Sequence, residues 1–213
     1  MTDEQSAADR AHAFVKERIL TGIFAGGTLI TEGEVSDALN MSRTPTREAF
    51  LRLQAEGLLR LYPKRGALVV PVSVSEIHDV LDARLLIERH AAETVIHAGH
   101  HQAVAAAMRA ILDRQREVTD PPGTHRFSEL DRLFHSTLVN ASGNQLLAGF
   151  YAALRDRQLR MSTNALLRDP NRFGTILTEH AYLCDLLEAG DAAVFATALT
   201  DHLVATRIAV TTS

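Results

Sequence analysis

The sequence is poor in cysteine and in long apolar runs, and each shortage excludes a class of protein. Cys184 is the only cysteine in 213 residues, which excludes an intrachain disulfide and suits a reducing cytoplasm. No apolar run approaches the roughly 18 residues that a membrane helix needs, and the polar, acidic N-terminus MTDEQSAADRAH is unlike a signal peptide. We therefore expect a cytoplasmic protein with no membrane partner.

Signatures of several enzyme classes are also missing. The chain has no glycine-rich phosphate-binding loop and no motif that activates a serine or cysteine nucleophile. Its hydrophobic share of 46% and charged share of 23% are ordinary for a globular protein. The length allows one large domain, or a small domain followed by a medium one.

Positive charge is unevenly distributed along the chain and is concentrated in one segment. The net charge is −4, which by itself argues against nucleic acid, yet residues 41–70 carry six basic and only two acidic side chains. A local field of this kind steers phosphate binding better than the whole-chain average predicts. Arg43 and Arg47 stand four apart in this segment, on either side of Thr-Pro-Thr, where a helix should begin. Ser42 or Thr44 is expected to cap that helix, so that both arginines project near its positive end.

The first 72 residues have the pattern of a winged helix-turn-helix. Apolar spacing predicts helices over residues 7–20, 34–39 and about 40–56, with TGIFAGGTLI as a turn-rich connection. LLRLY, PKRG and ALVVPV then predict a strand, a tight turn and a second strand.

This fold assigns a role to each basic residue of the segment. The third helix is the recognition helix, so Arg43 and Arg47, with Ser42 and Thr44 beside them, are expected to contact double-stranded DNA in the major groove. Lys64 and Arg65 lie at the hairpin tip, where a wing contacts phosphate or the minor groove. A basic run is often only a solvated face, so charge alone does not establish DNA binding.

From residue 73 onward the chain is predicted to be a second domain, an all-helical antiparallel bundle, which makes the whole protein mainly α. The domain boundaries are therefore 1–72 and 73–213. Helices are expected, starting after Ser75, over about 76–98, 102–118, 126–141, 144–167, 174–189 and 191–210.

Three histidines and an aspartate fall on core-facing stripes of these helices. Asp131 and His135 share the stripe of Phe127, Leu130, Phe134 and Leu138, while His180 and His202 lie among apolar residues of the last two helices. The latter two lie ten and eleven residues from the Gly190-Asp191 turn. In an antiparallel pair both are then roughly 15–17 Å from the turn and level with each other.

The four residues form a candidate metal site. A buried carboxylate and three buried imidazoles are costly alone, whereas a divalent cation satisfies all four. Zinc is the first expectation, with nickel or manganese as alternatives. The competing interpretation is a buried hydrogen-bond network, and a single core histidine is more often such a packing residue than a ligand.

Two arginines are candidates for binding an effector. Arg84 lies between Val80 and Ile87 on a core-facing stripe, and Arg157 between Leu154 and Met161. The guanidinium fork binds a carboxylate bidentately, so an inward arginine suits a small carboxylate effector. The alternative is an internal salt bridge, for which Glu88 and Asp156 are available.

The sequence resembles a known family over nearly its whole length. VSDALNMSRTPTREAFLRLQAEGLLRLYPKRGALV closely resembles the winged helix-turn-helix of GntR-family transcription regulators. DVLDARLLIE, ELDRLFHSTLVNASGNQLL and EHAYLCDLLEAGDAAVFATALTDHL resemble the FCD ligand-binding domain of their FadR subfamily. The resemblance implies a homodimer that binds a palindromic operator and that is released from it, or binds it again, when a metabolite binds. It also implies a metal held by the Asp-x-x-x-His pair and two later histidines.

One position departs from this pattern, and the function has more than one interpretation. Some members carry a further DNA-reading arginine early in the second helix, where this chain has Gly33. We expect a transcription regulator whose effector is a small organic acid held by the metal and a nearby arginine. The alternatives are a regulator that senses the metal itself and a metal-dependent enzyme, for which no general base can be assigned.

Overall fold

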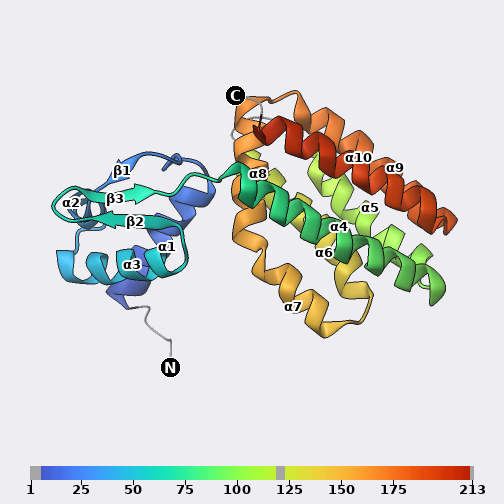
Figure 1. The fold of residues 1–213 in the computed structure, drawn as a ribbon, viewed down its shortest axis with the longest axis horizontal. Helices are drawn as coiled ribbons and strands as arrows, with labels where there is room; N and C mark the ends of the chain where they lie inside the picture. Colours follow the sequence, from blue (N-terminus) through green and yellow to red (C-terminus); the bar gives the residue numbers. More distant parts are fainter. Residues whose placement is uncertain (1–5, 119–122, 212–213) are drawn as a thin grey trace. The chain divides into compact units, whose positions relative to one another are not determined.

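The computed structural model describes residues 6–118 and 123–211, with side chains up to residue 206. The chain divides into two compact units, Met1–Val72 and Ser73–Ser213 (Figure 1). The described part is mainly helical with one small sheet, as predicted. None of the described helices is long and apolar enough to cross a membrane.

The first unit consists of three helices and a three-stranded antiparallel sheet. The strand order is β1-β3-β2, with Leu29 opposite Leu68 and Leu59 opposite Val69. The first strand was not predicted, because two residues show no periodicity; it pairs along the edge of β3. In chain order the elements are α1 (Ala7–Leu20), β1 (Leu29–Ile30), α2 (Glu32–Ala38), α3 (Arg43–Ala55), β2 (Leu59–Tyr62) and β3 (Gly66–Val69).

The helix-turn-helix pair α2 and α3 is fixed by one polar contact and a common core. Ser36 and Thr46, both buried, bring their hydroxyl oxygens to 2.9 Å. Beneath them Val35, Phe50 and Leu53 belong to a buried apolar cluster that also includes residues of α1 and the sheet. Burying these side chains fixes the face that α3 turns inward, so its polar face is left outside.

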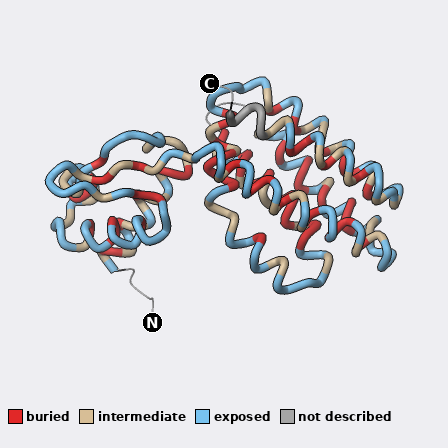
Figure 2. The backbone as a smooth tube through the Cα atoms, in the orientation of Figure 1, coloured by how far each residue is buried: buried red, intermediate tan, exposed pale blue. Residues whose placement is uncertain are grey.

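The second unit is a helical bundle that contains seven helices in the described residues. Figure 2 shows the buried residues gathered on the sides where the helices face one another. The helices are α4 (Val74–His97), α5 (His101–Arg116), α6 (Thr124–Ala141), α7 (Gln145–Ala153), α8 (Arg155–Arg168), α9 (Arg172–Ala189) and α10 (Ala192–Thr211).

Two predicted helix boundaries in this unit were wrong. The first helix begins at Val74, capped by Ser73, whose hydroxyl accepts the backbone N–H of Glu76, and not at Ser75. The single helix predicted over 144–167 is broken at Leu154. The break lets α7 turn Tyr151 inward, with its hydroxyl donating to Glu88 of α4 at 2.7 Å, while α8 packs along α6.

The hairpin of α9 and α10 and the lone cysteine agree with expectation. Gly190 ends α9 with a φ of 75°, in the left-handed region that favours glycine. The two helices pack against each other, as an antiparallel pair should (Figure 1). Cys184 is buried and free, and burial raises the pKa of its thiol to about 12, so it is protonated and unreactive.

Candidate nucleic-acid interface and metal centre

The basic residues predicted to contact DNA gather around one groove. Arg43 and Arg47 of α3 line it, together with Lys64 and Arg65 at the hairpin tip. All four side chains are exposed. Among the described residues none of them forms an ion pair, so their charge is available to an anion outside the chain.

The N-terminus of α3 differs from that of α2. Thr31 and Glu34 close the start of α2 with a reciprocal capping box. Ser42 is the residue before α3, but its hydroxyl caps no backbone N–H, and Thr44 lies within the helix. Ser42 therefore occupies the predicted N-cap position but makes no capping hydrogen bond, and Thr44 is not the cap. Both hydroxyls are left exposed at the positive end of the helix, which favours phosphate.

Gly33 leaves the start of α2 open toward Arg43. A Cβ placed on Gly33 would lie 3.7 Å from Arg43 Nη2, an ordinary van der Waals contact. The Arg43 guanidinium therefore lies beside Gly33, the position at which this chain departs from the expected pattern. Because Gly33 has no side chain, Arg43 is the basic residue that lies at this position.

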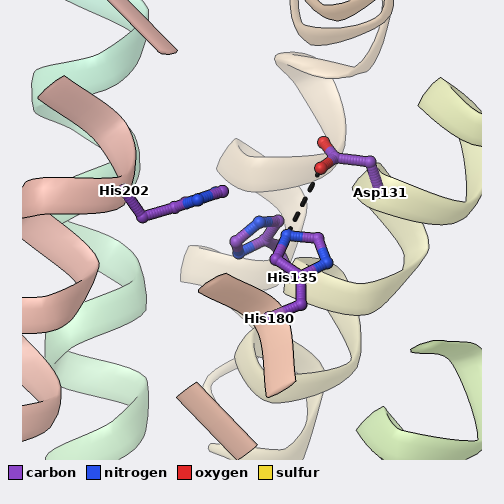
Figure 3. A group of neighbouring side chains, drawn as sticks. All are labelled: Asp131, His135, His180 and His202. Carbon is purple, nitrogen blue, oxygen red and sulfur yellow. Dashed lines mark ion pairs between the residues drawn. The ribbon is translucent and has the colours of Figure 1, made fainter. Parts of the chain in front are cut away.

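The structure brings the four predicted metal ligands together. Asp131 and His135 come from α6, His180 from α9 and His202 from α10. One ligand atom from each lies within 4.8 Å of the others, and all four residues are buried. In Figure 3 their side chains point toward a common centre from three helices.

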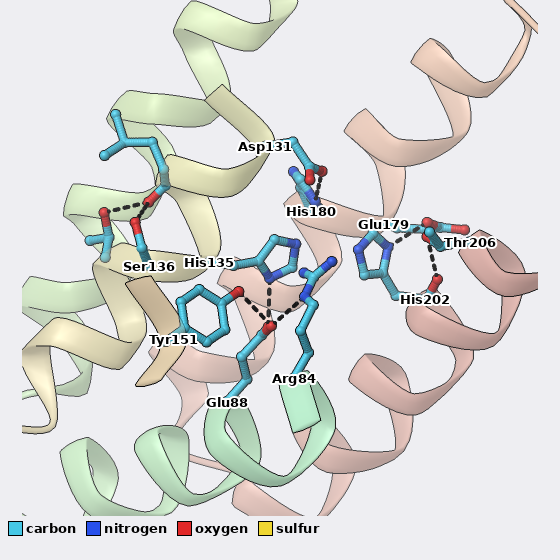
Figure 4. Close-up of polar contacts among 12 residues, drawn as sticks. Arg84, Glu88, Asp131, His135, Ser136, Tyr151, Glu179, His180, His202 and Thr206 are labelled. Atoms are coloured by element: carbon cyan, nitrogen blue, oxygen red, sulfur yellow. Dashed lines mark hydrogen bonds and ion pairs between the residues drawn. The ribbon is translucent and has the colours of Figure 1, made fainter. Parts of the chain in front are cut away.

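Each histidine ring is held by a second residue through its Nδ1 atom. His135 Nδ1 lies 2.7 Å from Glu88 Oε2, and His180 Nδ1 lies 2.8 Å from Gln115 Oε1. His202 Nδ1 lies 2.6 Å from an oxygen of Glu179. Figure 4 shows the contacts made by Glu88 and Glu179. An acceptor at Nδ1 places the proton there, so the Nε2 lone pair is free to bind a metal.

Two of the Nε2 atoms have no hydrogen-bond partner among the described residues. His135 Nε2 and His180 Nε2 are fully buried and unsatisfied. His180 Nε2 lies 3.4 Å from Asp131 Oδ1, and its ring stacks on Phe134 with centroids 4.0 Å apart. A buried hydrogen-bond network would satisfy these nitrogens, so their isolation favours a missing partner at the centre.

Burial keeps the imidazole rings of His135 and His180 neutral near pH 7. Burial lowers the pKa of His180 well below 6.5, and the neighbouring His135 and His202 lower it further. Burial also lowers the pKa of His135, although Glu88 opposes the shift. Neutral rings are the form that coordinates a metal, so the site is prepared near neutral pH.

Glu88 connects the histidine cluster to Arg84. Its side chain is fully buried, and Oε1 accepts from Arg84 Nε at 2.8 Å and from the Tyr151 hydroxyl at 2.7 Å, while Oε2 faces His135. Burial raises the pKa of Glu88, but Arg84 and His135 outweigh it and leave that pKa well below its usual value. Glu88 is therefore an anion that holds both an arginine and a histidine in place.

The two arginine predictions have opposite outcomes. Arg84 is buried and forms the salt bridge to Glu88 that was the alternative; its Nη2 atom still has no partner among the described residues. That residue lines a small cavity together with Asp131 and His202. Arg157 is half-exposed and pairs with Glu76 at 3.2 Å, so the predicted inward position was wrong. The apolar stripe was counted from Leu154, where the helix is in fact broken.

The residues that hold the histidines were largely missed from the sequence. Glu88 was considered only as a partner for Arg84, and its spacing of four residues from Arg84 was the available signal. Gln115, Glu179 and Tyr151 carry no comparable signal, because each reaches its partner from a different helix.

A winged helix-turn-helix followed by a helical bundle is the architecture of a DNA-binding transcription regulator. The family model described as "Bacterial regulatory proteins, gntR family" matches residues 7–69. The family model described as "FCD domain" matches residues 79–205. The chain belongs to the GntR family of regulators and carries an FCD domain. The prediction that it is a regulator and not an enzyme is thereby confirmed.

Individual relatives agree with this assignment. The HTH-type transcriptional repressor RspR of Escherichia coli K12 is 28% identical over 93% of this chain and 86% of its own length. The gluconate operon transcriptional repressor of Bacillus licheniformis is 26% identical over 87% of this chain and 77% of its own length. A GntR-type regulator from Rhodococcus sp. RHA1 has the same fold, with a TM-score of 0.74 at 21% identity over 97% of this chain and 98% of that one.

Proposed function

We propose that this regulator responds to a small organic acid, which binds at a divalent metal in the helical unit and changes the affinity of the winged unit for its operator. The observation that carries the proposal is the pair of buried Nε2 atoms, on His135 and His180, that have no hydrogen-bond partner in the described chain. Asp131 and His202 complete the set of ligand atoms.

The donor set fits a divalent transition metal. Three imidazole nitrogens and one carboxylate oxygen suit zinc, and nickel or manganese are alternatives. The acceptors at each Nδ1 are the outer contacts that metal-binding histidines normally have. The bound metal would supply a Lewis-acidic position for a carboxylate oxygen.

The effector site is the cavity beside these ligands. Arg84 lines it, and with Nε engaged by Glu88 it still has Nη2 free of any partner in the described residues. A guanidinium held in this way recognises a carboxylate. The name of one relative associates it with a gluconate operon, and gluconate is itself a carboxylate, which fits this class of effector.

The helix that carries Arg84 offers a route for the signal. Val74, the first residue of α4, follows the winged unit almost directly in the sequence. Arg84 and Glu88 occupy this same helix, so an acid that repositions Arg84 acts on the segment joined to the DNA-binding unit. Glu88 would transmit the same effect from the metal through His135.

The DNA-binding part of the proposal assigns base contacts to Arg43 and Arg47, backbone contacts to Ser42 and Thr44, and phosphate contacts to Lys64 and Arg65. One recognition helix reads only a few base pairs, so specificity calls for two half-sites related by two-fold symmetry. We therefore propose a homodimer on a palindromic operator, which sedimentation would detect as about twice the 23.3 kDa chain mass.

Titration of operator binding tests the proposal against a metal-sensing regulator. The affinity is measured with metal-free protein, with zinc alone and with zinc plus a panel of organic acids. We expect zinc alone to change the affinity little and an acid to change it only when zinc is present. A full response to zinc alone would identify the metal itself as the signal.

A further inference from the structure

The cavity beside the ligand cluster is lined by more hydrogen-bond donors than a single carboxylate needs. Besides Arg84 it is lined by Gln158 of α8 and Arg172, the first residue of α9. In the described chain no hydrogen-bond partner reaches Arg84 Nη2, Gln158 Nε2 or Arg172 Nε, although all three atoms are buried. Arg84 and Gln158 are only 5% and 6% exposed. Unsatisfied buried donors are costly, so this wall suits acceptor atoms from a ligand.

The charges around the cavity leave Arg172 without a balancing carboxylate among the described residues. Glu88 balances Arg84, and Asp131 balances one of the two charges of a divalent metal. Arg172 forms no ion pair within the described residues. Glu179, at the Nδ1 atom of His202, adds a second carboxylate beside the candidate ligands, so the charge of Arg172 is the one that remains for a second negative group of the effector.

The spacing and the apolar wall favour a short carbon chain between the two negative groups. Arg172 precedes His180 by eight residues on α9, about 12 Å along the helix axis. A long arginine side chain and a short diacid together span such a distance. Leu81, Met161 and Ile176 also line the cavity and suit a methylene spacer better than a phosphate. The cavity gives only about 20 Å³ to the centre of a water-sized molecule, so an acid enters with side-chain movement and a small one needs the least.

We propose that the effector is a short dicarboxylate of three or four carbons. One carboxylate lies at the metal and Arg84, and the second accepts hydrogen bonds from Arg172 and Gln158. The inference rests on the proposed function, because it places the acid at the metal site. Arg172 and Gln158 are then the residues that distinguish a diacid from a monoacid.

Calorimetric titration of zinc-loaded, full-length protein tests this assignment with matched pairs of acids. Malonate is compared with propionate and succinate with butyrate, since each pair differs in the second carboxylate, and inorganic phosphate serves as a non-carbon anion. We expect at least one diacid to bind about tenfold or more tightly than its monoacid partner, as a charge-assisted contact predicts. Arg172→Met should remove that preference and leave the monoacid affinity within about twofold.

Two further variants separate recognition from folding. Arg172→Lys keeps the charge without the planar fork and should retain part of the preference. Arg168→Met changes an exposed arginine outside the cavity and should retain all of it. Equal affinity for diacid and monoacid, tighter binding of phosphate, or an unchanged preference in Arg172→Met would overturn the dicarboxylate assignment and leave an organic-acid regulator standing. If zinc binds but no carboxylate binds or alters operator affinity, the proposed function fails as well.

Discussion

The two units keep their functional side chains in opposite environments. In the winged unit Arg43 and Arg47 are exposed and form no ion pair with any described residue. In the helical unit Asp131, His180 and the other two candidate ligands are at most 8% exposed, and each histidine ring contacts a second residue. An exposed cation needs nothing from its own chain, whereas a buried ligand needs a partner to fix its orientation and charge.

The difference predicts how each unit tolerates change. Replacing an exposed arginine removes a contact with DNA and leaves the fold intact. Replacing a buried polar residue in the cluster affects stability and ligand binding together, because the buried polar groups that it contacts lose a hydrogen-bond or ion-pair partner.

The largest expected effect on stability follows from Glu88→Gln. This change leaves Arg84 buried without its ion pair, which should lower the free energy of unfolding by about 3–5 kcal/mol. Urea denaturation of the full chain measures it. Glu93→Gln is the matched control on α4, because Glu93 pairs with Arg89 at the surface and should contribute less than about 1 kcal/mol. If both variants unfold alike, Glu88 does not have the central role assigned to it.

Removal of the metal should have the next largest effect on stability. A metal that binds only the folded chain stabilises it by mass action, by about 2.7 kcal/mol when its free concentration is one hundred times its Kd. Chelation should therefore lower the melting temperature of the parent protein. The Arg43→Ala, Arg47→Ala double variant should show the same drop, since its changes lie in the other unit. If chelation lowered the melting temperature of the parent but not of the double variant, the winged unit would affect metal binding in the helical unit.

Operator affinity should fall by about 1–3 kcal/mol for Arg43→Ala or Arg47→Ala if each arginine pairs bidentately with guanine. Base preference should relax at the contacted position. Lys64→Ala should instead weaken binding evenly across sequences and flatten its salt dependence. Binding to a randomised operator library at several salt concentrations measures both. A folded double variant of the two arginines that keeps full affinity would exclude α3 as the recognition helix.

The smallest expected effect is a loss of stability in acid by the metal-free protein. The pKa values of His135 and His180 are lowered by burial in the folded chain, so below pH 6.5 the unfolded chain binds protons that the folded chain does not. Their contribution is complete above pH 6.5 and is lost as the pH falls below it. Glu88, whose folded pKa is also lowered, loses its contribution only below 4.5. Urea midpoints that stay equal from about pH 7.5 to about pH 5.5 would contradict this assignment.

Local patterns predicted much of the fold, and their failures have physical causes. The recognition helix was found because Arg43 and Arg47 flank a helix start, whereas β1 was missed because a two-residue strand has no period. The break at Leu154 was missed because no proline or glycine adjoins it. Tyr151, just before the break, donates a hydrogen bond to Glu88 on another helix, a contact that the local sequence does not show.

The four candidate ligands could be predicted from the sequence, but the residues that contact their imidazole rings could not. His180 and His202 were placed level by counting residues from the turn at Gly190, which needs only the helical rise. The acceptors at their Nδ1 atoms, Gln115 and Glu179, lie on helices that do not carry the histidine they hold. Such pairings depend on how helices pack, and spacing within one helix cannot show them.

Elemental analysis of the purified protein tests the central claim most directly. The parent and its His180→Ala, His202→Ala double variant are reconstituted separately with zinc, nickel and manganese and then dialysed. His100→Ala, at an exposed position outside the cluster, serves as the control. The account predicts about one metal ion per chain in the parent and the control, and almost none in the double variant. Equal metal content in parent and double variant, or none in the parent with any of the three metals, would contradict it.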